Sequence, residues 1–517
     1  MQVYLNYIEG KWVEGHSPSG VVEGHSPSGV VAGSLHSFEA NRNPACPKQV
    51  LGQATKSSAE DIKRAVGAAS CVQRAWVKIP RPKRGEYLAK CAAYLEKNIE
   101  ILATLLTEEE GKNLNESRGE CLKAIRVLEF MASESRRPVG EMLPSEMPGT
   151  MIYTTRMPLG VVGIITPWNF PVCIPAWKIA PALLEGNAVV FKPASLTPAT
   201  ARFLVKAFEE TGLPPGVLNL VYGSGSTVGN ALIADSRVRA ISFTGSNEIG
   251  AQVHALAAKR FCRTQLEMGG KNPVVVLEDA DLDCAADAVV MGAFGSTGQR
   301  CTATSRVILV PQIREVFVQK LLERVRKIKV GNGLKDPTAM GPVVDENQYK
   351  AVLSAIQKAK KDGAKILCGG EPLADEQGGY FISPTVFDGV NPASDLAQKE
   401  IFGPVLAILN AKDFEQALEL ANNVEYGLSA SLFTQDISSI QRFNAEIECG
   451  IVHINSATVG GEAQAPFGGV KQTGLGGREM GKMGPEFFCE IKTVYVDYNT
   501  RTARTGVLDE ARKRNLY

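Results

Sequence analysis

The chain has 517 residues, of which 44% are apolar and 21% charged, and its net charge is +1. One hydrophobic core rarely supports a chain of this length, so two or more structural units are expected. A near-neutral charge provides no strong field for holding a polyanion, which argues against nucleic acid as a partner.

The beginning of the chain carries an exact duplication. No basic segment followed by an apolar run precedes it, so we expect no secretory signal and predict a cytoplasmic protein. Residues 13–21 read VEGHSPSGV, and residues 22–30 repeat the same letters. Because this segment is rich in Gly, Ser and Pro, it predicts a duplicated surface loop.

Helices are predicted next. Ser58 followed by Asp61 is a capping pattern that opens a helix, and apolar residues then recur at helical spacing as far as Trp76. Further amphipathic helices are expected to about Ser133. This part of the chain predicts a helical layer.

An uncharged stretch over 158–177 is long enough to cross a membrane. It contains four prolines and several glycines, which would leave backbone groups without partners in lipid. We therefore expect no membrane partner. We predict instead an extended segment over 151–165 that ends in a buried strand, followed by a turn over 166–171.

The middle of the chain alternates strand and helix patterns. Their order is typical of a doubly wound parallel sheet, the usual platform for a dinucleotide. A second α/β stretch follows over 267–469, and the polar residues from Asn499 onward predict a tail. The predicted strands are 189–191, 217–221, 240–243, 272–276, 306–310 and 404–409, and the predicted helices between the first three are 198–210 and 227–234.

Three polar turns follow predicted strands, at 192–195, 223–226 and 244–246. In such a sheet nucleotides bind at the carboxyl ends of the strands. The spacing Gly223-x-Gly225-x-x-x-Gly229 is one residue off the dinucleotide fingerprint and is equally compatible with a simple turn. Lys192 is suitably placed for ribose hydroxyls or a 2′-phosphate, although a single loop lysine is often only solvated.

Two further residues have chemical potential. Cys301 lies in a Gly- and Ser/Thr-rich turn beside Arg300, a setting expected to favour the nucleophilic thiolate. Glu267 precedes two glycines in an otherwise apolar segment, where burial would raise the pKa of its carboxyl and suit it to activate water. Taken singly, each residue is better explained by an ordinary structural role.

The joint occurrence of seven motifs resembles the aldehyde dehydrogenase superfamily, and the resemblance extends from about Tyr4 to Tyr495. In chain order the motifs are TPWNFP at 166–171, FKPAS at 191–195, FTGS at 243–246, LEMGGKNP at 266–273, GQRCTA at 298–303, EIFGPV at 400–405 and PFGGVKQTG at 466–474.

The resemblance implies an α/β fold with three parts. A Rossmann-type dinucleotide-binding domain would comprise 1–133 and 156–266, and a second α/β catalytic domain would comprise 267–470. A small oligomerisation arm and tail would comprise 134–155 and 488–517, which implies a homodimer or homotetramer.

The resemblance also implies an NAD(P)-dependent oxidation of an aldehyde to a carboxylic acid. Cys301 would attack the aldehyde carbonyl, and the Asn169 amide with the Cys301 backbone N–H would form the oxyanion hole. Hydride transfer to the nicotinamide would leave a thioester. Glu267 would activate the water that hydrolyses the thioester. Glu479 matches a carboxylate that is often assigned to a proton relay, although a plain surface glutamate is the alternative interpretation.

For the cofactor, the resemblance implies that Lys192 holds the adenosine ribose, Glu400 the nicotinamide ribose, and Phe402 packs nearby. Strictly NAD-using relatives commonly carry a carboxylate at the position of Ser195, so serine here makes NADP the preferred cofactor and NAD the second. With five scattered histidines and no close C-x-x-C pair, no metal is expected. The adenine and pyrophosphate path would be lined by Ile165, Trp168, Gly225 and Ser246.

Four outer stretches resemble one branch of the family, the 2,5-dioxopentanoate (α-ketoglutarate semialdehyde) dehydrogenases. A carboxylate-bearing substrate would need polar donors, for which Arg300 and Gln464 are candidates, and Trp177 and Cys173 would line the tunnel. The stretches are CTATSR at 301–306, MGPVVDENQ at 340–348, TVGGEAQAPFGG at 458–469 and GPEFFCEIKTVY at 484–495.

Alternatives remain at this stage. Succinate semialdehyde or a broad range of aliphatic aldehydes would suit the same motifs. A relative that passes the acyl group to coenzyme A is disfavoured by Glu267, since a hydrolytic base is needed only when water is the acceptor. A non-catalytic binding protein on this fold is disfavoured by the presence of Cys301, Glu267 and Asn169.

Overall fold

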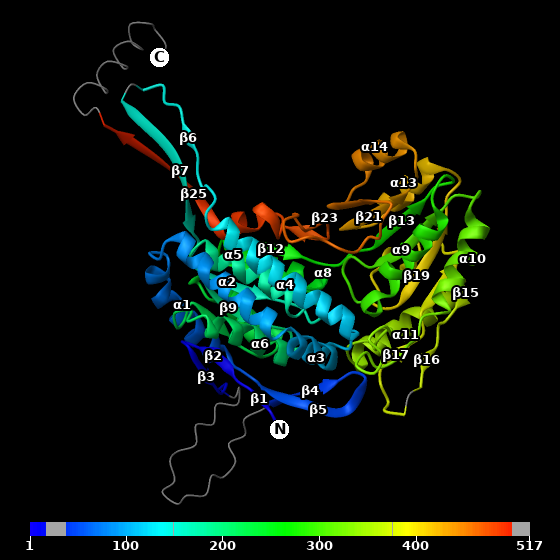
Figure 1. Ribbon diagram of the computed structural model, residues 1–517, viewed down its shortest axis with the longest axis horizontal. Coiled ribbons are helices and arrows are strands. Elements are labelled where there is room, and N and C mark those ends of the chain that lie inside the picture. The colour runs from blue at the N-terminus through cyan, green and yellow to red at the C-terminus, as the bar shows by residue number, and fades with distance from the viewer. Residues whose placement is uncertain (17–37, 148, 375, 499–517) are drawn as a thin grey trace, which may run out of the picture.

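The computed structural model describes residues 1–16, 38–147, 149–374 and 376–498. Most of the duplicated segment, residues 17–30, and the predicted tail from Asn499 lie outside the described residues. Two large sheets with their helices form the body, and a narrow ribbon of strands projects from it (Figure 1).

The first sheet has the strand order β24-β12-β11-β8-β9-β10-β2-β3. Its five central strands are parallel, and β24, β2 and β3 are added antiparallel at the two edges. The predicted order of strands and helices is confirmed. The bounds are β2 (Asn6–Ile8), β3 (Lys11–Val13), β8 (Val161–Ile165), β9 (Ala188–Lys192), β10 (Leu218–Leu220), β11 (Val238–Thr244), β12 (Arg263–Glu267) and β24 (Gly474–Leu475).

Helices cover both faces of this sheet, which is why every residue of β8, β9 and β10 is buried. One core lies against α2 (Arg81–Lys97), α3 (Ile99–Glu110), α4 (Leu114–Glu134), α5 (Cys173–Leu184) and α6 (Pro198–Glu210). The other lies against α1 (Ala59–Trp76), α7 (Asn230–Ala234) and α8 (Asn247–Ala258).

Local sequence explains several of these boundaries. Ser58 caps α1, and Asp61 completes the capping box, as predicted. The predicted helix over 227–234 instead starts with a π-helical turn, Gly225–Gly229, before α7. Helix α5 was not predicted, because all its residues are buried and it therefore shows no amphipathic pattern. In the described ranges, no helix combines the length and apolarity that a membrane crossing requires.

The second sheet has the order β15-β18-β19-β14-β13-β21-β22, parallel except for β15. The three strands predicted here are confirmed to within two residues. Its strands are β13 (Asn272–Val276), β14 (Thr304–Leu309), β15 (Lys365–Cys368), β18 (Thr385–Asp388), β19 (Val405–Asn410), β21 (Ser429–Phe433) and β22 (Ile451–Ile454). Its helices are α9 (Leu282–Phe294), α10 (Arg314–Val325), α11 (Glu346–Lys361), α12 (Asp395–Gln398), α13 (Phe414–Asn422) and α14 (Ile437–Glu446).

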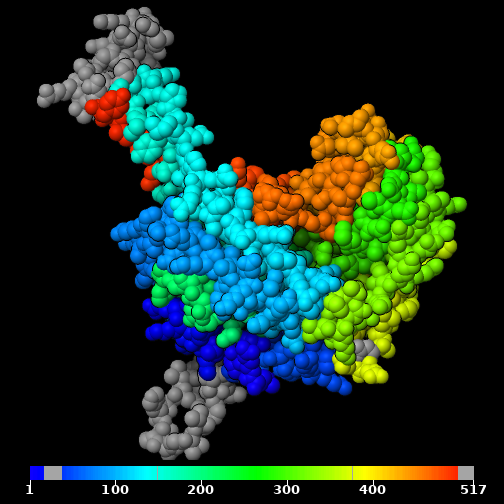
Figure 2. Space-filling view, in the orientation of Figure 1, coloured from blue at the N-terminus to red at the C-terminus, as the bar shows by residue number. Residues whose placement is uncertain are grey.

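The projecting ribbon, called the arm below, consists of β6 (Met142–Leu143), β7 (Thr150–Pro158) and β25 (Cys489–Asp497). β25 pairs antiparallel with β7 along its whole length. Figure 2 shows the arm standing clear of the body. The remaining short strands are β1 (Val3–Tyr4), β4 (Phe38–Asn43), β5 (Cys46–Thr55), β16 (Pro372–Leu373), β17 (Phe381–Ile382), β20 (Tyr426–Gly427) and β23 (Val470–Lys471).

The first sheet contains a reversal of strand order. From β8 the chain runs to β9 and β10 on one side, then returns to β11 and β12 on the other. The carboxyl ends of β8 and β11 therefore lie at the switch point. In open α/β sheets this is where ligands bind.

Candidate active site

A cavity of about 230 Å³ lies at this switch point. The turns after β8, β11 and β12 contribute to its wall, together with residues that flank strands of the second sheet. It brings together residues from predicted motifs that are far apart in the sequence. The lining residues are Pro167, Trp168, Asn169, Ile174, Thr244, Gly245, Ser246, Met268, Gly269, Cys301, Gln348, Glu400 and Phe402.

Cys301 is partly buried in the wall of this cavity. Its backbone carbonyl accepts a hydrogen bond from Asn272 Nδ2 at 2.8 Å. Burial raises the pKa of the thiol to about 12, and the charges of Glu400 and Glu267 act in the same direction. The thiol, not the thiolate, is therefore the resting form.

The prediction that Arg300 favours the thiolate is wrong. The Arg300 guanidinium donates to Ser296 Oγ at 3.0 and 2.9 Å and lies 3.5 Å from a Glu116 oxygen. These partners occupy the guanidinium, and the pKa of Cys301 is raised, not lowered. Their positions depend on the fold and could not be inferred from sequence adjacency.

A buried ion pair anchors the turn that carries Asn169. Lys112 Nζ donates to Glu120 Oε2 at 2.7 Å and to the backbone oxygen of Asn169 at 2.6 Å. The other Glu120 oxygen accepts from the backbone N–H groups of Val172 and Cys173 at 2.8 and 3.1 Å. Both ends of the turn are thus bound to the start of α4.

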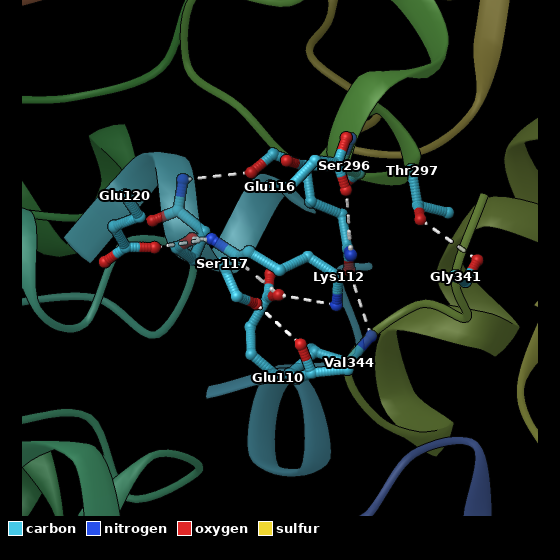
Figure 3. Close-up of polar contacts among 12 residues, drawn as sticks. Glu110, Lys112, Glu116, Ser117, Glu120, Ser296, Thr297, Gly341 and Val344 are labelled. Atoms are coloured by element: carbon cyan, nitrogen blue, oxygen red, sulfur yellow. Dashed lines mark hydrogen bonds and ion pairs between the residues drawn. The ribbon is translucent and has the colours of Figure 1, made fainter. Parts of the chain in front are cut away.

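The same region also binds the loop before Cys301, as Figure 3 shows. Glu116 Oε1 accepts from the backbone N–H of Ser296 at 2.6 Å. Asn169 Nδ2 donates to the backbone oxygen of Gln299 at 3.0 Å. The Asn169 amide and the Cys301 loop are therefore held in one network.

Glu267 ends β12 and is buried beside Gly468, where an added Cβ would lie 2.3 Å from its Oε1. Only glycine fits this close approach, and Gly468 also has a φ of 143°. Burial, followed by the charge of Glu479, raises the pKa of Glu267 well above its usual value, which confirms the predicted direction. The backbone N–H of Gly469 acts to lower this pKa, but within the described chain neither carboxylate oxygen makes a well-formed hydrogen bond.

Glu479 is not a surface residue. It is 2% exposed and pairs with Lys178 of α5, which also donates to Ser242 Oγ at 2.9 Å. The pair acts on the pKa of Glu267, Glu479 raising it and Lys178 lowering it. The structure thus places three ionisable side chains in one buried group.

In the cavity wall, the rings of Trp168 and Phe402 meet edge to face, with their centroids 5.4 Å apart. Gln348 Nε2 donates to the backbone oxygen of Phe402 at 2.8 Å. Ser246 caps α8, so that the helix begins at the cavity wall. Glu400 Oε1 accepts from Gly270 N–H at 3.0 Å, and burial raises the pKa of this carboxyl to about 7.

Lys192 ends β9, directly beside Ile165 at the end of β8. Its Nζ donates to the backbone oxygen of Pro193 at 2.9 Å, and burial lowers its pKa to about 8. Ser195 is half-buried in the following turn, and Gly225 is exposed at the start of the π-helical turn. Neither lines the 230 Å³ cavity.

Two of the residues predicted to face the substrate have protein partners instead. Arg300 contacts Ser296 and Glu116, and the Gln464 side chain donates to Glu462. Cys173 is completely buried, and burial raises its pKa to about 12. Trp177 packs against Phe467 with ring centroids 5.3 Å apart. The structure therefore leaves Arg300 and Gln464 with protein partners and Cys173 without exposed surface.

The described geometry agrees with comparisons to known proteins. The model of the aldehyde dehydrogenase family matches residues 32–494. The chain belongs to this family. It is similar to an alpha-ketoglutaric semialdehyde dehydrogenase of Bacillus subtilis (strain 168), with 46% identity covering 95% of this chain and 98% of the relative.

A 2,5-dioxopentanoate dehydrogenase of Saccharolobus solfataricus is 44% identical to this aldehyde dehydrogenase over 88% of the chain and 95% of the relative. Among solved structures, betaine aldehyde dehydrogenase from Staphylococcus aureus in complex with NAD+ has a TM-score of 0.90 and 34% identity. That match covers 96% of this chain and 95% of the other. The family and fold predicted from the seven motifs are confirmed.

The lining of this cavity suits part of a nicotinamide dinucleotide, while Ile165, Lys192, Ser195 and Gly225 lie outside it. Thr244 Oγ1 lies in the cavity wall, buried and without a hydrogen-bond partner in the described structure, so a donor or acceptor is available to a ligand. An added Cβ at Gly269 would lie 2.3 Å from Glu400 Oε2. The absence of a side chain there keeps Glu400 in the cavity wall.

Sequence reasoning missed Lys112, Glu120, Lys178 and Gln348. Lys178 did leave a signal, because it is the only charged residue in 173–184, a segment otherwise apolar throughout. A cation there requires a buried acidic partner. Lys112 and Glu120 left none, because both lie among other charged residues near the start of a helix.

Proposed function

We propose that this aldehyde dehydrogenase oxidises 2,5-dioxopentanoate to 2-oxoglutarate with NADP or NAD. The observation that carries the proposal is the position of Cys301 in the wall of a cavity at the switch point, next to Asn169 and Glu400. The substrate is suggested by the activities for which two relatives, 44% and 46% identical to this chain, are named.

In this proposal Cys301 is the nucleophile. Because its pKa is about 12, the thiol must lose its proton to a base as its sulfur attacks the aldehyde carbon. Glu267 is the proposed acceptor, since burial raises the pKa of its carboxyl and so makes the carboxylate a stronger base. After oxidation, and once that proton has passed to solvent, the regenerated carboxylate would deprotonate the water that hydrolyses the Cys301 thioester and releases the acid.

Asn169 and the Cys301 backbone N–H are the proposed oxyanion donors. Asn169 Nδ2 donates to Gln299 with one hydrogen, which leaves its second hydrogen available. The Cys301 N–H makes no backbone hydrogen bond within the described residues. Two donors thus remain near the position where the aldehyde oxygen acquires charge.

When bound, the dinucleotide supplies the oxidant for the aldehyde carbon. We propose that Lys192, Ser246, Glu400 and Phe402 hold it, with Ile165, Trp168 and Gly225 along its path. NADP is the proposed preference, because Ser195 carries no charge to repel a 2′-phosphate and Lys192 can attract one.

We further propose a homodimer or homotetramer joined through the arm. The arm exposes apolar side chains that an aqueous surface does not favour, among them Ile491 (63% exposed) and Tyr495 (67% exposed). The domain division at 133, 156, 266 and 470 and a cytoplasmic location also remain proposals. All eleven cysteines are free thiols, which suits a reducing compartment.

Initial-rate measurements with both cofactors test this function. The substrates are 2,5-dioxopentanoate, succinate semialdehyde and neutral aliphatic aldehydes, and the acid product is quantified separately. We expect the highest kcat/KM with 2,5-dioxopentanoate and NADP, one 2-oxoglutarate per reduced cofactor, and no turnover in Cys301→Ala. Higher kcat/KM with neutral aldehydes would reject the substrate, and faster turnover with saturating NAD would reject the cofactor preference.

A further inference from the structure

Lys123 of α4 reaches a pair of aromatic rings beside the active site. Its Nζ lies 5.4 Å from the ring centroid of Trp177 and 5.9 Å from that of Phe467. The two rings, which are 5.3 Å apart, are almost fully buried. Since ring faces attract cations, they hold the ammonium group at a defined place.

This place differs from the dinucleotide cavity. Neither Trp177 nor Phe467 lines that cavity, but both belong to the core cluster against which Cys301 packs. The pKa of Cys301 is raised mainly by burial, and the charge of Lys123 acts against that rise. The ammonium is therefore close enough to Cys301 to influence it from outside the dinucleotide cavity.

Lys123 also lacks an anion. In the ranges that the structure describes, its Nζ makes no hydrogen bond and no ion pair. Besides the two rings it lies beside Gly461, where an added Cβ would be 3.3 Å from Nζ. An ammonium that lies beside two aromatic rings and has no counter-charge is free to bind an anionic ligand through a charge-assisted hydrogen bond. Other cations around the site already have acidic partners: Lys112 has Glu120, Lys178 has Glu479 and Arg300 has Glu116.

We propose that Lys123 binds the carboxylate of the aldehyde substrate and so selects acidic semialdehydes over neutral aldehydes. The inference rests on the proposed function, because it assigns a residue to the recognition of that substrate class. The aldehyde carbon lies at Cys301, the carbon chain extends along Trp177 and Phe467, and the carboxylate meets the ammonium. Lys123 thus replaces Arg300 and Gln464 as the residue for carboxylate recognition.

Lys123→Met tests the proposal, because Met keeps the length of the side chain but removes the charge. Lys123→Arg keeps the charge. Lys90→Met is the matched control, since Lys90 lies 5.8 Å from the centroid of the Tyr87 ring on α2, away from the site. For each variant, thermal unfolding is measured first, then kcat/KM for 2,5-dioxopentanoate, succinate semialdehyde, glutarate semialdehyde and pentanal.

We expect Lys123→Met to lower kcat/KM for the acidic substrates about 10- to 100-fold, mainly through KM, as the loss of a charge-assisted hydrogen bond predicts. For pentanal the change should be below about threefold. Lys123→Arg should keep most of the preference for acidic substrates, and Lys90→Met should equal the wild type. A folded Lys123→Met enzyme with an unchanged ratio of acidic to neutral substrates overturns the proposal.

The panel separates this inference from the proposed function. If the wild type prefers succinate or glutarate semialdehyde and Lys123→Met loses that preference, the inference stands and the proposed substrate is wrong. If the wild type prefers 2,5-dioxopentanoate and Lys123→Met keeps the preference, the proposed substrate stands and the inference about Lys123 is wrong. A wild type that prefers pentanal rejects both.

Discussion

Two buried lysine–glutamate pairs lie near Cys301, and they differ in how completely their oxygens are used. One oxygen of Glu120 accepts a hydrogen bond from Lys112, and the other accepts from two backbone N–H groups. In the second group, Glu479 pairs with Lys178, but Glu479 Oε2 and both oxygens of Glu267 make no well-formed hydrogen bond among the described residues.

This difference indicates different roles: the fully bonded Glu120 supports the structure, and the incompletely bonded group around Glu267 is available for chemistry. A buried carboxylate whose acceptor sites are all used holds backbone in place and has no capacity left for a proton. An incompletely bonded one is costly for the fold, but it can accept a proton or bind water. We therefore expect the Lys112–Glu120 pair to govern stability and the Glu267 group to govern the rate.

The largest effect is expected for Glu267→Gln. Loss of the general base should lower kcat by about 10²- to 10⁴-fold, while unfolding changes little because no hydrogen bond is lost. Mass spectrometry during turnover separates the two roles of Glu267: the acyl adduct on Cys301 accumulates where hydrolysis is the slower step, and Cys301 stays unmodified where its attack is the slower step. An unchanged kcat would contradict the role of Glu267 in both the proposed function and this comparison.

Glu120→Ala should act in the opposite way. Removal of the carboxylate leaves Lys112 buried beside a weaker partner, Glu110 at 3.8 Å, and should cost about 3–5 kcal/mol in the free energy of unfolding. The measurement is the free energy of the first unfolding transition in urea. Glu86→Ala is the control, because its ion pair with Lys83 is exposed and its loss should leave the transition nearly unchanged.

The reactivity of Cys301 in the cofactor-free enzyme gives a third test. Because the pKa is raised to about 12, the thiolate fraction increases throughout the accessible range of pH. Alkylation by iodoacetamide, followed by peptide mass spectrometry, should accelerate about tenfold per pH unit between pH 7 and pH 9. A plateau near neutral pH would show that the thiol is already activated. Cys301→Ser controls for labelling at other cysteines.

The smallest effect is expected for Glu479→Gln. This residue acts on Glu267 through its charge and has no place in the cavity wall. Since the Glu479 charge raises the pKa of Glu267, its removal should lower that pKa and move the acidic limb of the kcat–pH profile to lower pH. The change in kcat at neutral pH should be no more than about tenfold. An unchanged kcat–pH profile would show that Glu479 does not act on the pKa of Glu267.

Much of the site could be predicted, because its residues lie in short motifs at strand ends. Trp168, Asn169, Ser246, Cys301 and Glu400, all predicted site residues, line the cavity that the structure shows. Their electrostatics could not be predicted in the same way. The pKa of Cys301 depends on burial by distant segments, and Arg300 is occupied by Glu116, which lies 184 positions earlier.

Fold prediction had the same limit. Where one face of a helix meets water, as in α1, periodicity and a capping box predicted it. Where an element is buried on all sides, as in α5, periodicity vanished and the helix was missed. Lys123 was missed for the opposite reason, since a lysine on an amphipathic helix looks like surface until Trp177 and Phe467 are placed beside it.

Strand β24 has a consequence for how the enzyme matures during translation. It pairs with β12 so that Gly474 lies opposite Glu267, although the ribosome adds it more than 200 residues later. A nascent chain would already carry its nucleophile and base while the β12 edge stays unpaired. Catalytic competence should therefore arise only near the end of synthesis, and premature termination should yield inactive protein.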